Sequence, residues 1–405
     1  MSGVRLLTGC LAVVFLCVAA SASAAGQYLE MRFERAEYRA QGGVDIVLDP
    51  STPANGALGG GLKARILSID MYATVSEGRR AYKLGYDIWD SEFPDHLDSD
   101  DDLAQLQTDI NDLARRIKGE DFLLELHTRI DLLNFMLNKG PWTVQLGGYA
   151  EFLSGANMVV PEKLDLVQGQ DTYLDIGRSQ RLLRAGGRGD AGFSLGVGYA
   201  IPFADSNVQW SLGGRVRGFY RFSMPEHAVT ANAHIYDEQD IHYPTDIDFL
   251  HGWGVGLDFY TTLHFSEDLT GFRVGAYVED LVKVVAPGDG KGFFVPPRFG
   301  VGFAWISPDG KFTVGTDLER VETFRPKWQP TWQSGIAYRL GTDALYVTPK
   351  AGFILNHRNI VNAHVSPAIT GGLEINLVAL KVVGAVEYHT ATGAVNAAAS
   401  LGIGF

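Results

Sequence analysis

Charged side chains recur at every second position of several apolar stretches. Arg215, Arg217 and Arg221 alternate with Val216 and Tyr220. Successive side chains of a β-strand point to opposite faces, so the three guanidinium groups share one face and the apolar side chains share the other. Two kinds of chemistry suit such a face: pairing with acids on neighbouring strands, or selection of a solute at a constriction.

The same alternation gives a larger set of residues predicted to face the interior of a barrel. An Arg or Lys that faced lipid at the membrane midplane would cost about 2–4 kcal/mol, so the regular placement of charge on one face indicates an aqueous or plugged lumen. Mutual ion pairing and a substrate-selective constriction both remain open. The candidate lumen-lining residues are Arg215, Arg217, Arg221, Asp258, Arg273, Glu279, Arg298, Asp317, Arg339, Lys350, Glu374, Lys381 and Glu387, with Glu319 on the same face.

No motif of covalent or metal catalysis stands out. The chain contains no G-x-S-x-G, no H-E-x-x-H, no P-loop and no dinucleotide-binding glycine motif. The stretch Glu226–His251 holds four histidines among several acids, yet their spacing matches no compact ligand set. It is predicted to be a solvated acidic loop, with a divalent-cation or lipopolysaccharide-bridging site as the alternative. We therefore expect no enzyme, no cofactor and no metal site.

Long strands are needed to position these side chains, and the alternation predicts them. In Val395–Phe405 the odd positions are apolar and the even positions are small or polar. About fourteen such segments follow Ala64, most of about 9–14 residues, and a membrane-crossing strand needs about 9–11. The predicted fold is therefore all-β: an antiparallel transmembrane barrel of about 14 strands, with twelve and sixteen as neighbouring counts and a soluble β-protein as the alternative.

The connections predict two different rims. Short turns such as Lys139–Pro141 and Pro308–Gly310 alternate with longer connections, for which the sequence suggests Ser154–Asp190, Ser223–Leu250 and Val285–Pro297. Short turns on one rim and long loops on the other are typical of outer-membrane barrels.

The N-terminus predicts export. Arg5, an apolar stretch over Leu11–Ala20 and the small residues Ala22-Ser23-Ala24 have the form of a signal peptide over residues 1–24. Both cysteines, Cys10 and Cys17, fall inside it. Its removal would take away Arg5 and no acid, which leaves 33 basic against 47 acidic side chains. This acidic balance argues against nucleic acid as a partner.

Two segments depart from the strand pattern. Residues 25–61 have weak periodicity and many glycines, and they are predicted to form either a lumen plug or a periplasmic tail before a barrel over residues 62–405. Within the barrel, residues 98–119 place Leu103, Leu106 and Ile110 at helical spacing. This insert is predicted to be an amphipathic helix, packed on its own barrel or docked on a periplasmic protein partner.

The C-terminus carries a possible assembly signal. Ala399, Leu401, Ile403 and Phe405 form an apolar row that looks like the terminal strand signal read by the barrel-assembly machinery. Aromatic residues such as Trp142, Trp210 and Trp253 lie near segment ends, as expected for the two membrane interfaces. We therefore expect outer-membrane lipid and lipopolysaccharide as partners, in the outer membrane of a Gram-negative bacterium.

Several stretches of the chain follow one another in an order that is similar to that of a known family. The helical insert is followed by VGAYVEDLVKVVAPG (Val274–Gly288), PPRFGVGFAW (Pro296–Trp305), FTVGTDLERVE (Phe312–Glu322), QSGIAYRLG (Gln333–Gly341), ITGGLEINL (Ile369–Leu377), VVGAVEYH (Val382–His389) and LGIGF (Leu401–Phe405). In this order the mature chain resembles the TraF-type conjugal-transfer family of outer-membrane proteins, relatives of the fatty-acid transporter FadL and of PorV. The family usually has an N-terminal run of small residues and glycines followed by Asn-Pro-Ala. Of this motif, Gly42-Gly43 and Pro53–Ala57 remain here. The resemblance implies a FadL-like barrel with an N-terminal lumen segment.

Two functions are compatible with these features. One is a porin-like channel or transporter for small molecules, hydrophobic ones included, for which the Gly-rich strands and the polar inner face are expected. The other is a scaffold that transports nothing and docks periplasmic or surface partners, associated with conjugation or secretion. The substrate, the openness of the lumen and the oligomeric state do not follow from the sequence.

Overall fold

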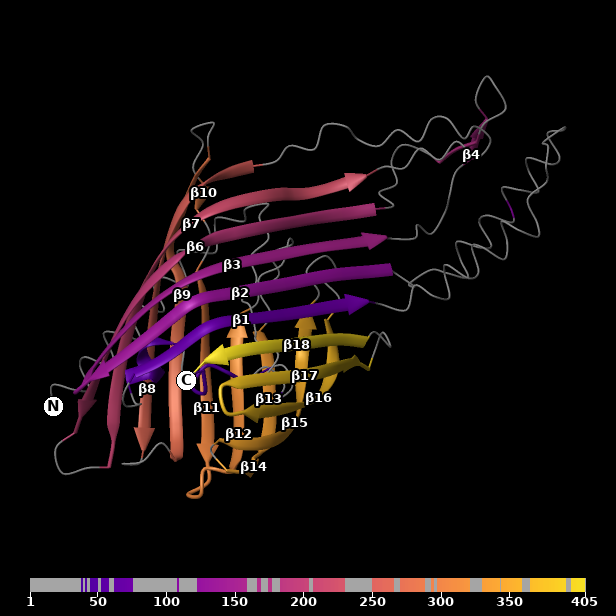
Figure 1. The fold of residues 1–405 in the computed structure, drawn as a ribbon. Coiled ribbons are helices and arrows are strands. Elements are labelled where there is room, and N and C mark those ends of the chain that lie inside the picture. The colour runs from indigo at the N-terminus through magenta and orange to yellow at the C-terminus, as the bar shows by residue number, and fades with distance from the viewer. Residues whose placement is uncertain are drawn as a thin grey trace.

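Fourteen long strands form one antiparallel sheet whose two ends pair with each other (Figure 1). The closing contact joins the first and last strands, where Ile69 lies opposite Leu401 and Met71 lies opposite Ala399. The predicted all-β barrel of about 14 strands is therefore confirmed. The wall strands are β1 Leu62–Val75, β2 Phe122–Lys139, β3 Trp142–Met158, β6 Leu183–Pro202, β7 Gln209–Val229, β8 Leu250–Phe265, β9 Gly271–Pro287, β11 Arg298–Ile306, β12 Phe312–Arg320, β13 Pro330–Tyr338, β15 Leu345–Arg358, β16 Val365–Leu377, β17 Leu380–His389 and β18 Val395–Gly404.

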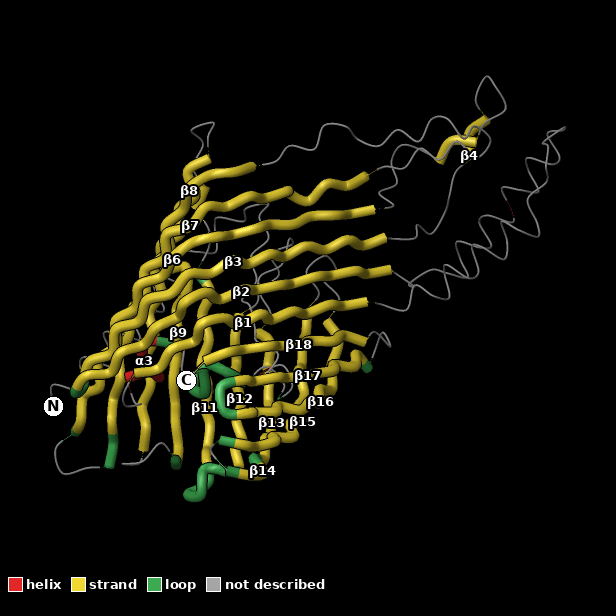
Figure 2. The backbone as a smooth tube through the Cα atoms, in the orientation of Figure 1, coloured by secondary structure: helices red, strands yellow, loops and turns green. Residues whose placement is uncertain are grey.

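The remaining elements are short. The strands β10 (Phe293–Phe294) and β14 (Leu340–Gly341) pair with β9 and β15, while β4 (Leu166–Gln168) and β5 (Leu174–Ile176) pair only with each other. A single helical turn, α3 (Pro53–Ala57), precedes the barrel. Figure 2 shows that the described chain is almost entirely strand.

The computed structural model describes only part of the chain. The signal segment 1–24, the insert 98–119 apart from Thr108, and Phe405 lie outside the described residues, so the predictions made for them stay predictions. The described residues are 38, 41, 44–49, 52–57, 62–75, 108, 122–158, 166–168, 174–176, 183–203, 207–229, 250–265, 270–287, 293–294, 297–320, 330–342, 344–358, 365–390 and 395–404.

The alternation of side chains separates an apolar outside from a polar inside. In β18, Val395, Leu401 and Ile403 are exposed, whereas Asn396 and Ala398 are buried, as the period of two predicted. Large apolar side chains such as Phe193, Trp253 and Ile369 project outward around the barrel with 60–74% of their surface exposed. An apolar outer face around a polar inner face is the arrangement of a barrel that crosses a lipid bilayer. Among the described residues, no helix is both long and apolar enough to cross a membrane.

The strands on one side of the barrel run further than the sequence indicated. β6 has 20 residues and β7 has 21, so the predicted loops Ser154–Asp190 and Ser223–Leu250 are wrong in extent: β3 continues to Met158 and β7 to Val229. Backbone pairing needs no hydrophobic alternation, so the sheet continues where the two-faced pattern fades. The short turns were placed correctly, and Gly140 and Gly310 adopt the positive φ angles of 60° and 67° that these turns need.

Candidate lumen site

The N-terminal segment crosses the inner wall of the barrel. Its described residues from Gln41 to Ala57 lie, in chain order, against β13, β12, β11, β9 and finally β7 and β6. Eight of the wall positions beneath it are glycines. They are Gly335 under Gln41, Gly315 under Val44, Gly300 and Gly302 under Ile46, Gly275 under Val47, and Gly196, Gly198 and Gly213 under α3.

Six of these glycines form three cross-strand pairs. Gly198 lies directly opposite Gly213, Gly275 opposite Gly302, and Gly315 opposite Gly335. Each lies three or four residues from the short-turn end of its strand. On β6, β7, β9, β11, β12 and β13 the pairs leave the inner wall without a side chain beneath the segment, close to the rim of short turns. On β8 the segment instead contacts side chains, those of Tyr260 and Thr262.

The contacts leave no room for a side chain at these glycines. A Cβ at Gly275 would lie 2.7 Å from Cγ1 of Val47, and one at Gly315 would lie 2.5 Å from Cγ1 of Val44. Both distances are shorter than carbon atoms tolerate without bonding. At Gly198 and Gly335 a Cβ would overlap the backbone carbonyl of Pro53 or of Gln41, so the close approach of two backbones, rather than a turn, requires glycine there.

Hydrogen bonds from the wall hold the backbone of the segment. Oδ2 of Asp317 on β12 accepts hydrogen bonds from the N–H groups of Asp45 and Ile46, at 2.7 and 2.9 Å. A guanidinium nitrogen of Arg273 on β9 donates to the carbonyl of Val47 at 3.4 Å. Two of the predicted lumen residues thus contact the protein's own N-terminal segment.

Asn55 closes the segment into a compact loop. Its side-chain nitrogen donates to the carbonyls of Ile46 and Asp49 at 2.9 and 3.0 Å, and its oxygen accepts from Oγ1 of Thr262 on β8 at 2.6 Å. One buried amide therefore satisfies groups on both the loop and the wall.

An apolar cluster completes the seat. Ile46, Val47 and Ala54 pack with Tyr260, Tyr277 and Ala304 of the wall, all of them buried. This burial supplies the larger share of the attraction, because each buried CH₂ contributes about 0.8 kcal/mol.

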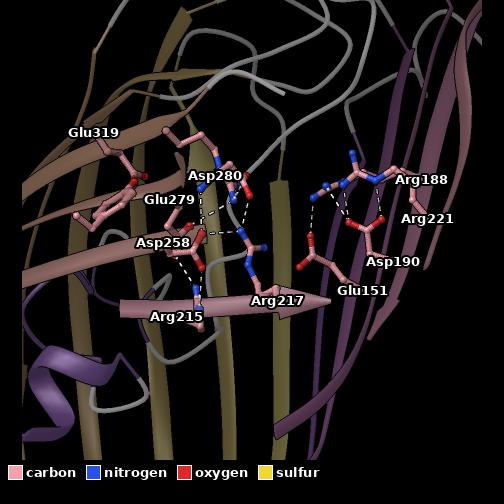
Figure 3. Close-up of polar contacts among 12 residues, drawn as sticks. Glu151, Arg188, Asp190, Arg215, Arg217, Arg221, Asp258, Glu279, Asp280 and Glu319 are labelled. Carbon is pink, nitrogen blue, oxygen red and sulfur yellow. Dashed lines mark hydrogen bonds and ion pairs between the residues drawn. The ribbon is translucent and has the colours of Figure 1, made fainter. Parts of the chain in front are cut away.

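A central ion-pair cluster lies further from the short-turn rim than the segment. We define it as Arg215, Arg217, Asp258, Glu279, Asp280 and Arg298, which lie six to nine residues from that end of their strands (Figure 3). Arg215 Nε lies 2.8 Å from Asp258 Oδ2, and its Nη2 lies 3.0 Å from Glu279 Oε1. Arg298 Nη2 lies 3.0 Å from Asp280 Oδ2.

Arg217 connects Asp258 on β8 with Asp280 on β9. Its Nη2 lies 2.7 Å from Asp258 Oδ1, and it also pairs with Asp280. Tyr260 donates to Glu279 at 2.7 Å. With three guanidinium groups and three carboxylates, the central cluster is balanced in charge.

A β-bulge places the two adjacent acids of this cluster together. Leu257 pairs with Val282, and Phe259 pairs with Val278, so a single residue of β8 faces three of β9. Asp280 adopts a φ of 58°, and its N–H donates to Asp258 at 2.9 Å. The two extra residues let Glu279 and Asp280 turn to the same inner face, against the period of two.

A second ion-pair cluster lies eight to fourteen residues from the short-turn end of its strands, partly beyond the central cluster. We define it as Arg129, Asp131, Glu151, Arg188, Asp190 and Arg221, on β2, β3, β6 and β7 (Figure 3 shows four of them). Arg188 Nη2 lies 2.6 Å from Glu151, and Arg221 Nε lies 2.7 Å from Asp190. Arg129 contacts Asp131 at 2.9 Å and Glu151 at 3.3 Å. It too contains three cations and three carboxylates.

Phe219 separates the two clusters along β7. It lies between Arg217 and Arg221 in the inward row and is 1% exposed. Its strand neighbours on both sides are glycines, Gly192 on β6 and Gly254 on β8, and a Cβ at Gly254 would overlap the phenyl ring. The two missing side chains give the ring its space.

The other predicted residues do not join these clusters. Glu374 contacts Lys350 at 2.7 Å and Lys381 at 3.2 Å, on β15, β16 and β17. Glu387 contacts His389 at 3.0 Å on β17, and Arg339 lies over the ring of Tyr346. The predicted set is thus divided among several groups around the wall, and its role in lining a solute path stays a prediction.

Of the charged residues in the second cluster, only Arg221 was among the predicted lumen-lining residues. Asp190 follows Arg188 at a spacing of two, and Asp131 follows Arg129 in the same way. The period of two could have found them. Asp280 could not be found in this way, because the bulge that turns it inward breaks the period.

Comparison with known proteins gives similarity of fold alone. No protein-family model matches the chain, and no curated protein matches it. Among solved structures it is similar to a mutant of the monoaromatic hydrocarbon channel TodX, with a TM-score of 0.49 and 12% identity over 92% of this chain and 99% of that chain. A Pseudomonas aeruginosa FadL homologue gives 0.49 and 7% over 93% and 99%, and the Pseudomonas putida toluene transporter TodX gives 0.46 and 11% over 93% and 100%. Nothing in these comparisons supports the TraF-type resemblance.

Proposed function

We propose that the protein is an outer-membrane channel for small molecules whose lumen is occupied by its own N-terminal segment. The observation that carries this proposal is the three glycine pairs on which the described residues between Gln41 and Ala57 lie. Wall positions without side chains are suited to a segment held without covalent bonds. Hydrogen bonds and apolar packing can be broken and remade, so such a segment can open or close a passage.

The location follows from the outer face and the N-terminus. An apolar outer face fits lipid and lipopolysaccharide, and a signal peptide over residues 1–24 would deliver the chain to the envelope. We include the barrel-assembly machinery as a partner through Ala399, Leu401, Ile403 and Phe405. Kinship with the TraF-type family remains a hypothesis about descent, and conjugation is no part of the proposed activity.

The proposed solutes are uncharged and small, with hydrophobic molecules included. Each ion-pair cluster holds three cations and three carboxylates, which contact one another rather than face the lumen unpaired. A balanced wall exerts little long-range attraction on ions. The hydrocarbon channels with which the fold was compared are named for such molecules, and we extend this class to the present chain as part of the proposal.

Solute flux into vesicles tests the proposal. Residues 25–405 and a variant lacking 25–61 would be refolded into liposomes, and swelling would be followed with neutral solutes of graded size. We expect little swelling for the longer chain and rapid, size-limited swelling for the shorter one. Equal impermeability of both, with both migrating as folded barrels in heat-modifiability gels, would contradict the proposal.

A docking scaffold is the second candidate. The dense pairing of buried charges on the inner face favours it, because a lumen filled by side chains and by the N-terminal segment would pass nothing. The insert 98–119 would then carry the partner. Loss of partner binding when this insert is deleted, together with impermeable vesicles, would support the scaffold.

A further inference from the structure

We propose that Asp317 is the positioning residue that holds the N-terminal segment on the barrel wall by recognising its backbone. The inference rests on the proposed function, in which this segment occupies the lumen. In this proposal the Asp317 carboxylate anchors the segment, and the surrounding glycines allow the segment to approach it.

The geometry at Asp317 is that of a carboxylate bound to successive amides. A single oxygen, Oδ2, accepts from the N–H groups of both Asp45 and Ile46. Hydrogen bonds to an ionised acceptor are roughly twice as strong as neutral ones. Asp317 is 1% exposed, so water does not compete for these bonds.

The surroundings single out this side chain. Gly302 lies directly opposite Asp317 on β11, and Gly315 precedes it by two residues on β12. A Cβ at Gly302 would overlap Oδ1 of Asp317 and would lie 2.8 Å from Cβ of Ile46. The neighbouring positions Gly302 and Gly315 carry no side chain, so the segment can approach the Asp317 carboxylate from this side.

Recognition of the backbone restricts which residues can stand at positions 45 and 46. Asp317 contacts N–H groups, so it requires a donor at positions 45 and 46 but does not read their side chains through these bonds. Proline lacks that donor. A proline at position 46 should therefore weaken the attachment in the same way as loss of the carboxylate.

Glu319 provides a matched control on the same strand. It lies two residues beyond Asp317 on the same inner face and is also buried. Its oxygens accept from Tyr277 at 2.8 Å and from Gln333 at 3.1 Å, and both donors belong to the wall. Neutralising Glu319 changes the charge by the same amount and acts on hydrogen bonds within the wall.

The test measures exposure of the segment rather than transport. Both cysteines of the chain lie within the first 24 residues, so residues 25–405 with Val47→Cys carry a single thiol at a side chain that is 0% exposed. Labelling by a water-soluble maleimide would be timed in refolded barrels with and without Asp317→Asn. Glu319→Gln, Ile46→Pro and Ile46→Val would be measured in parallel, and a heat-modifiability gel would verify folding of each.

We expect Asp317→Asn and Ile46→Pro to accelerate labelling at least about tenfold, since they raise the population of the detached segment. Glu319→Gln and Ile46→Val should leave the rate near that of the parent. Parent-like protection in folded Asp317→Asn would overturn the inference, as would equal acceleration by Glu319→Gln. If the variant lacking 25–61 passes no solute, the proposed function fails, yet the labelling rates still decide the role of Asp317.

Discussion

Gly315 of β12 lies directly opposite Gly335 of β13, and both lie beneath the N-terminal segment. Val44 covers the first glycine and the carbonyl of Gln41 covers the second. The pair shows how strand register, rather than any local motif, builds the seat. Two glycines on different strands become neighbours, and the wall loses two adjacent side chains at the place where the segment crosses it.

Filling the seat should displace the segment. Gly335→Ala would place a methyl group against Gln41, whose backbone and side-chain atoms are the nearest neighbours of a Cβ at this position. Overpacking of this kind costs about 1–3 kcal/mol, and here the segment can yield whereas the hydrogen-bonded wall cannot. We expect faster cleavage of residues 38–57 by added protease. Gly384→Ala is the control, because a Cβ there meets nothing within 4 Å, and cleavage should be unchanged.

Phe219 and Gly254 should be coupled in stability. Gly254→Ala would push a methyl group into the phenyl ring and cost about 1–3 kcal/mol. In a Phe219→Ala background the ring is absent, so the same substitution should cost clearly less. Guanidinium unfolding of the four proteins in lipid vesicles, followed by tryptophan fluorescence, gives the double-mutant cycle. Purely additive effects would show that the ring does not occupy the space above Gly254.

Removal of one charge from the central cluster should cost more than removal of an outlying one. Arg217→Met leaves Asp258 and Asp280, each 0% exposed, with one fewer cation. Breaking a buried pair in this way costs about 3–5 kcal/mol. Lys381 is 27% exposed and contacts Glu374 at 3.2 Å, so Lys381→Met should cost no more than about 1 kcal/mol. Unfolding free energies in vesicles would reveal whether the order is reversed.

The turn between β11 and β12 should respond to acid. Hydrogen bonds from Ser307 Oγ and from the N–H of Lys311 hold the pKa of the Asp309 carboxyl below its ordinary value. A pKa lowered by folding means that the contribution of Asp309 is present above its unfolded pKa and is lost as the pH falls through the folded pKa. When the carboxyl carbon NMR shift of Asp309 is followed against pH, its titration midpoint should lie below that of a free aspartate. A midpoint at the ordinary value would mean that these bonds do not form in solution.

The barrel could be predicted from the sequence because its cause is periodic. Val395, Leu401 and Ile403 project outward because each strand has one lipid face. The same period placed Arg215, Arg217 and Arg221 on the inner face, where the structure finds them paired. A local pattern of period two is enough when the environment on each side of the wall is uniform.

The lumen site could not be derived in full, for two physical reasons. The pairing of Gly198 with Gly213 depends on register between strands, which is fixed only when the sheet forms. Asp280 depends on a bulge with a left-handed backbone at a residue other than glycine. The contacts of Asp317 with the described residues Asp45 and Ile46 likewise join positions far apart in the chain, and no sequence pattern displays them.

Single-channel conductance in planar lipid bilayers tests the central claim most directly. Residues 25–405 and the variant lacking 25–61 would be inserted under identical conditions, and current steps would be counted at fixed voltage. If the N-terminal segment occupies a passage through the barrel, the longer chain should give small or rare steps and the shorter chain discrete, larger ones. Absence of steps from both proteins, with folded barrels recovered from the membrane, would contradict a channel and leave a sealed scaffold.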